Sequence, residues 1–70
     1  MYYAEYHRYY AFPAKAERDK WVAENEFEGA NYVAAPVTRK VIERVMGKNF
    51  KVVANYYFDG LNVVLRANDC

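Results

Sequence analysis

The run Phe50-Lys-Val-Val-Ala-Asn-Tyr-Tyr-Phe-Asp-Gly-Leu-Asn-Val-Val-Leu-Arg66 organises the predicted fold, because its pattern is typical of a β-hairpin. Asp59-Gly60 separates two runs of strand-forming residues, and a two-residue type I′ turn needs positive φ at both central positions. Gly adopts such a φ freely and Asp tolerates it. The turn therefore predicts an antiparallel pair whose inner face is apolar and comprises Phe50, Val52, Ala54, Tyr56, Phe58, Leu61, Val63 and Leu65.

The register of this hairpin decides which side chains face the core. With a two-residue turn, Phe58 lies opposite Leu61, and the pairing continues along both strands through Tyr56 with Val63 and Ala54 with Leu65. The reverse face is mixed and comprises Lys51, Val53, Asn55, Tyr57, Asn62, Val64 and Arg66. No other segment is an obvious cover for this reverse face, so we expect it to stay open.

Two helices and one further strand complete the expected fold. Residues 2–12 favour a strand that ends at Pro13, and residues 14–25 favour a helix that Trp21 holds against the sheet. Residues 37–46 favour a second helix, capped by Thr38 and closed by Gly47. Its expected core stripe comprises Val41, Ile42, Val45 and Met46.

The order of these elements predicts an α+β fold, β-α-α-β-β. We expect a three-stranded antiparallel sheet with two helices packed on one face. Which edge of the hairpin pairs with the first strand is left open, and residues 26–36 show no clear period. The whole chain, residues 1–70, is expected to form a single domain.

Size and composition restrict the class of protein. The chain has 70 residues, of which 54% are hydrophobic and 27% charged, and this is typical of a small globular protein. A chain of this size has a stability of about 3 to 5 kcal/mol. No apolar run approaches the ~20 residues of a membrane span, and the start at Met1 lacks the pattern of a signal peptide, so we expect a cytoplasmic protein without membrane contact.

The residues that most enzymes need are scarce. The chain has no Ser, a single His at position 7, and a single Cys at position 70. A nucleophile with an adjacent base, a metal site built from His or Cys, and a glycine-rich phosphate loop are therefore not indicated. We expect a protein that is not an enzyme and that has no catalytic residues, no metal and no cofactor.

Aromatic and basic residues are the candidates for partner contact. Aromatic residues make up 19% of the chain, and Tyr alone occurs eight times. Many of them are expected in the core, but Tyr and Arg are also enriched at interface hot spots. We expect an open aromatic sheet face with Tyr3, Tyr9, Tyr57 and Arg66, and a basic edge with Arg39, Lys40, Arg44 and Lys48.

Three kinds of partner fit these residues. Protein binding is the leading hypothesis, because Tyr and Arg surfaces suit it. An aromatic sheet face could instead stack the bases of single-stranded nucleic acid, although the net charge of +1 is low for phosphate binding. The same face could also pair with a second copy of the chain in a homodimer.

Two motifs resemble a group of known sequences. Tyr9-Tyr-Ala-Phe12 followed by Glu17-Arg-Asp-Lys-Trp-Val22, and the later Thr38-Arg-Lys-Val41, resemble segments of short uncharacterised proteins of bacteriophages and mobile elements. The likeness covers about the first two-thirds of the chain. Those proteins often have a small polar cap where this chain has Pro13, and the hairpin has no counterpart in the resemblance. The resemblance implies a small protein in a bacterial host cytoplasm that binds and inhibits a host defence protein, as anti-CRISPR proteins do.

Overall fold

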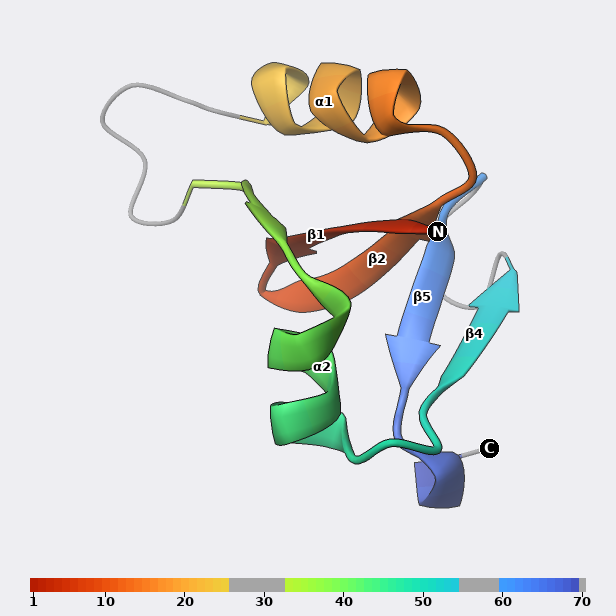
Figure 1. Cartoon of the computed structure of the whole chain (residues 1–70). Coiled ribbons are helices and arrows are strands. Elements are labelled where there is room, and N and C mark those ends of the chain that lie inside the picture. Colours follow the sequence, from red (N-terminus) through yellow and green to blue (C-terminus); the bar gives the residue numbers. More distant parts are fainter. Residues whose placement is uncertain (26–32, 55–59, 70) are drawn as a thin grey trace.

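The structure is a computed structural model that describes residues 1–25, 33–54 and 60–69. These residues form an α+β fold with a five-stranded antiparallel sheet in the order β3-β1-β2-β5-β4 (Figure 1). In chain order the elements are β1 (Tyr2–Tyr6), β2 (Arg8–Phe12), α1 (Lys15–Glu24), β3 (Ala35–Val37), α2 (Arg39–Met46), β4 (Lys51–Ala54), β5 (Asn62–Leu65) and a 3₁₀-helix, η1 (Ala67–Asp69). The predicted three-stranded sheet is therefore wrong, and two additional strands account for the difference.

The first additional strand arises because residues 2–12 form a hairpin and not one long strand. β1 and β2 are antiparallel, and only His7 separates the paired Tyr6 and Arg8. His7 has φ 64°, a left-handed conformation in which His occurs more often than most residues. Because one residue forms the turn, even-numbered side chains face the same side in both strands, so the sequence alternation continues through the turn. The alternation alone therefore cannot distinguish this hairpin from one strand.

The second additional strand is β3, which lies in the stretch without a clear period and includes Val37, the residue assigned to the start of the second helix. β3 pairs with β1, with Tyr3 opposite Val37 and Ala4 opposite Pro36. Pro cannot donate to a β-ladder and is accepted in edge strands, and β3 forms one edge of the sheet. A three-residue strand with a central Pro carries little sequence signal.

The hairpin of β4 and β5 forms, but its predicted register is wrong. Val53 lies opposite Val63 and Ala54 opposite Asn62, so Ala54 does not face Leu65. The observed register differs from the predicted one by a shift of three residues. This shift puts Val53, and not Val52, on the face that carries Val63. Both Val63 and Val64 are buried, so β5 is covered on both faces and its alternation does not select one register for β4. The predicted pairs of Tyr56 and Phe58 lie outside the described residues.

The two helices cover opposite faces of the sheet (Figure 1), so the prediction that they share one face is wrong. The core under α1 comprises Ala4, Tyr10, Phe12, Val22, Ala34, Val63 and Leu65. The core under α2 comprises Tyr3, Ala11, Ile42 and Val64. The chain changes sides at β3, because an edge strand lets it pass from one face of the sheet to the other (Figure 1).

The predicted cap of α2 at Thr38 and its close at Gly47 are confirmed, but the helix begins at Arg39 and not at Val37. The Thr38 side chain accepts a hydrogen bond from the Val41 N–H at 3.4 Å, which caps the helix. Gly47 follows the last turn with φ 90°, and its N–H donates to the Glu43 carbonyl at 2.9 Å. α1 begins after Pro13 without a side-chain cap, so it depends more on its contacts with the sheet. In the ranges that the structure describes, no helix has the length and apolar character to cross a membrane.

Candidate functional site

The solvent-facing side of α2 carries two adjacent stripes of exposed side chains. Lys40 and Arg44 are four residues apart and form a basic stripe, and Val41 and Val45 form an apolar stripe beside it. Val41 is 36% exposed and Val45 is 46% exposed, whereas Ile42 is fully buried against the sheet. Lys48, just beyond the helix, is also exposed. We call Lys40, Val41, Arg44, Val45 and Lys48 the α2 surface.

Arg39 fixes α2 to the sheet. Its Nη1 donates to the Tyr3 hydroxyl at 3.1 Å, and its Nε donates to the Glu43 carboxylate at 3.0 Å. The guanidinium also lies 4.6 Å from the ring centre of Phe50, and that ring meets Tyr3 edge-on at 6.0 Å. The hydrogen bond to Glu43, followed by the Tyr3 contacts, raises the pKa of Arg39. Arg39 therefore supports the α2 surface structurally.

Arg66 holds the other end of the helix. Its Nη2 donates to the Val45 carbonyl at 3.2 Å, where the last turn of a helix has unsatisfied carbonyl groups. A cation at this end also interacts favourably with the helix dipole. Arg66 thus connects the end of β5 to α2, and it stands beside the α2 surface.

Two of the three tyrosines expected on an open sheet face, Tyr3 and Tyr9, are covered in the structure. Tyr3 is 4% exposed and belongs to the core under α2. Tyr9 is half-buried and packs against the same core, and this burial, followed by the charge of Glu5, raises the pKa of Tyr9. Tyr57 lies outside the described residues. α2 therefore covers the face on which Tyr3 and Tyr9 were expected to be open.

The four basic residues predicted as one edge, Arg39, Lys40, Arg44 and Lys48, do lie together on α2 and directly after it. Residues 33–54 contain these four and Lys51, but only one acidic residue, Glu43, so the net charge of this segment is 5 − 1 = +4. Few negative charges are available in this segment to offset the basic ones. The segment thus has a positive field that the chain's net charge of +1 conceals.

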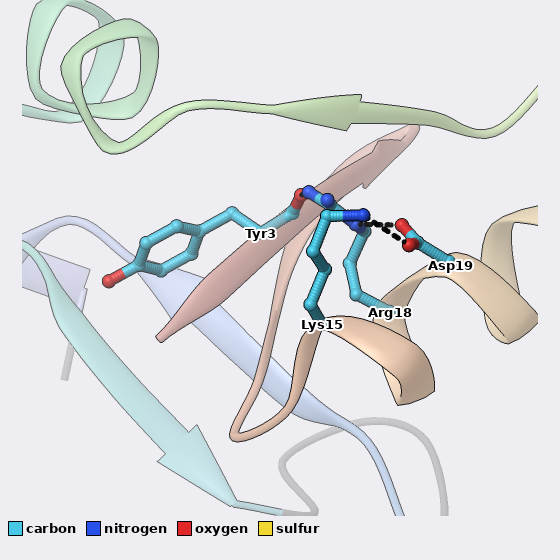
Figure 2. Close-up of polar contacts among 4 residues, drawn as sticks. All are labelled: Tyr3, Lys15, Arg18 and Asp19. Atoms are coloured by element: carbon cyan, nitrogen blue, oxygen red, sulfur yellow. Dashed lines mark hydrogen bonds and ion pairs between the residues drawn. The ribbon is translucent and has the colours of Figure 1, made fainter.

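The charges of α1 are balanced, which makes the α2 surface distinct. Residues 15–24 contain three basic and three acidic side chains. Asp19 is 2.7 Å from both the Lys15 Nζ and the Arg18 Nε (Figure 2), and these hydrogen bonds, Lys15 first, lower the pKa of its carboxyl group. Arg18 also donates to the Tyr3 carbonyl at 3.1 Å, while the Tyr3 ring extends away from this group (Figure 2). The hydrogen bond from Arg18 connects α1 to β1. Because its basic and acidic side chains are equal in number, α1 has no net charge.

The exposure of Val41 and Val45 is the feature that sequence reasoning missed. The pattern assigned both valines to the core together with Ile42 and Met46. That four-residue stripe is wider than the narrow arc through which α2 meets the sheet, so only Ile42 is fully buried. The neighbouring Lys40 and Arg44 were the available sequence signal, because they place the two valines beside a basic surface.

Comparison of the chain with protein-family models, with curated proteins and with solved structures finds no significant match.

Proposed function

We propose that this protein is a non-enzymatic binding module that contacts a partner protein through the α2 surface. The observation that carries the proposal is the pair of exposed valines, Val41 and Val45, beside Lys40, Arg44 and Lys48. Exposed apolar side chains become favourable when a partner covers them, and the basic side chains at their edge select an acidic partner surface. The proposed partner surface therefore has an apolar centre and carboxylates around it.

The resemblance of the first strand and helix to short phage and mobile-element proteins supports a more specific form of this proposal. In that form the partner is a host defence protein in a bacterial cytoplasm, and binding inhibits it. A chain of 70 residues can block a larger protein by occupying a functional surface, which requires no chemistry of its own.

Single-stranded nucleic acid is the second candidate, because residues 33–54 have a net charge of +4. The two valines argue for a protein, since exposed aliphatic side chains gain nothing from phosphate groups. A homodimer that buries the α2 surface is less favoured, because it would bring two positively charged segments together.

Affinity capture from bacterial lysate, with two variants of the α2 surface, tests the proposal. The double variant Val41→Ser/Val45→Ser removes the apolar stripe, and Arg44→Gln/Lys48→Gln removes two charges. We expect each double variant to keep its circular dichroism spectrum and to bind a captured partner at least tenfold more weakly. Lys15→Gln/Lys20→Gln on α1 is the matched control for charge and should retain binding.

The same variants distinguish the candidates. Binding to single-stranded DNA at low salt that Val41→Ser/Val45→Ser leaves intact and Arg44→Gln/Lys48→Gln abolishes would favour the nucleic-acid function. Sedimentation of the free chain as a stable dimer that these substitutions dissociate would favour the homodimer. A captured partner that binds all α2 variants as well as the original chain would refute the α2 surface as its contact.

A further inference from the structure

A pocket of about 300 Å³ lies on the α1 face of the sheet, where the β1–β2 hairpin, α1 and the start of β5 meet. Its walls are the rings of Tyr6, Tyr10 and Trp21, and His7, Arg8 and Asn25 add polar groups. We call it the aromatic pocket. α2 covers the opposite face of the sheet, so the pocket is separate from the α2 surface.

The aromatic walls are held in a fixed arrangement. The Trp21 ring centre is 5.0 Å from that of Tyr10 and 6.1 Å from that of Tyr6, with interplanar angles of 54° and 80°. Phe12 contacts the same indole ring at 5.5 Å. Rings that meet at steep angles present both faces and edges to the space between them, and a planar aromatic group packs well against both.

The polar groups favour an anion over a cation. Among the described residues that line the pocket, Arg8 contributes a positive charge and none is a carboxylate. Arg8 also interacts with other groups of the chain, so a ligand would share a guanidinium that has five N–H donors. The Asn25 Nδ2 donates to the Trp21 carbonyl at 2.8 Å, which fixes the amide at the end of α1.

Arg8 and the two tyrosines of the pocket belong to the same β1–β2 hairpin. Tyr6 and Arg8 are paired neighbours on the same face of the hairpin, and Tyr10 follows Arg8 on that face. Burial raises the pKa of Tyr10, and the positive charge of Arg8 opposes this increase. Arg8 is thus a lining residue of the pocket on the same face as the two tyrosines.

We propose that the aromatic pocket binds a small planar aromatic molecule that carries a carboxylate or phosphate group. The ring lies among Tyr6, Tyr10 and Trp21, and the anionic group faces Arg8. The volume is at the lower end for ligand pockets, so it fits one ring or two fused rings and not a larger cofactor. Aromatic rings also attract cations, but the positive charge of Arg8 in the described lining repels an ammonium group, so an anionic ligand is the preferred occupant.

Two probes with the same ring and opposite charges test this proposal. Phenylacetate and phenethylamine are titrated into the protein, and Trp21, the only tryptophan, reports binding through its fluorescence and its indole N–H resonance. We expect a saturable response to phenylacetate and at least fivefold weaker binding of phenethylamine. Chemical shift changes should centre on Tyr6, Tyr10 and Trp21.

Arg8→Gln should abolish the preference for the anion, while Arg44→Gln, which removes one positive charge from α2, should preserve it. No saturable response to either probe, or shift changes centred on α2, would refute the pocket as a ligand site. Equal binding of the two probes to the original chain would refute the role of Arg8. Because the partner-binding variants lie on α2, failure of one proposal leaves the other testable.

Discussion

The two faces of the sheet are covered by different means. Under α1, one large side chain, Trp21, contacts three aromatic rings from β1 and β2, and Val22 is the only buried residue of that helix. Under α2, Ile42 is completely buried against a small core with Val64, and hydrogen bonds from Arg39 and Arg66 hold the helix. A helix can therefore dock through one aromatic residue or through one aliphatic residue with polar contacts around it.

This difference determines where surface features remain. The rings around Trp21 do not fill their side of the sheet completely, and a pocket of about 300 Å³ results. The narrow contact of α2 leaves Val41 and Val45 at the surface. The face of the sheet under α1 thus has a concave site, whereas α2 on the opposite face has a convex, exposed site.

Ile42→Ala should have the largest effect, because it removes the central contact of the α2 face. We expect a loss of about 3 to 4 kcal/mol in the free energy of unfolding, since Ile42 is fully buried. Against a total of about 3 to 5 kcal/mol, the variant would be largely unfolded. Urea denaturation followed by Trp21 fluorescence measures this. Val41→Ala, at an exposed position of the same helix, should change stability by less than about 0.5 kcal/mol.

Trp21→Ala should have the second largest effect, about 2 to 3 kcal/mol. The side chain is large and contacts three rings, but it is only half-buried, so the loss should be below that of a completely buried Trp. Thermal unfolding monitored by circular dichroism provides the measurement, and Trp21→Phe, which keeps a ring, should lose less. A greater loss for Trp21→Ala than for Ile42→Ala would make the aromatic face the more stabilising one.

Tyr10→Phe should have the smallest effect, confined to alkaline pH. Burial raises the pKa of Tyr10 above 10.0, so the folded chain retains this phenolic proton more strongly than the unfolded chain does. The resulting stabilisation is complete below pH 10 and is lost as the pH rises through the folded-state pKa. Unfolding measured from pH 8 to pH 12 should show a smaller alkaline loss for Tyr10→Phe than for the original chain. Tyr2→Phe, at a position that is 43% exposed, is the control; an identical profile for Tyr10→Phe and the original chain would contradict the prediction.

Local signals in the sequence were sufficient for parts of the fold. The cap at Thr38, the Gly47 terminus and the contact of Trp21 with the sheet are confirmed, because each depends on residues close in sequence or on one dominant side chain. The turn at His7 was missed because the alternation continues through it. β3 was missed because the residues of β1 with which it pairs lie 30 to 34 positions earlier in the sequence.

The candidate site was predictable to a similar extent. The basic residues of α2 were recognisable as a sequence cluster, and helical spacing brings them together. The positions of Tyr3 and Tyr9 were not, because their burial depends on which face α2 covers, and that depends on the path of the chain at β3. Local pattern carries no information about that path.

His7 restricts how this chain can vary in evolution or in design. With φ 64°, the position accepts Gly, Asn or Asp at little cost, whereas a β-branched residue would be strained there. Its side chain is exposed, so packing does not impose the restriction. A substitution table built on burial would rate position 7 as tolerant, yet the backbone makes it one of the most restrictive positions of the hairpin.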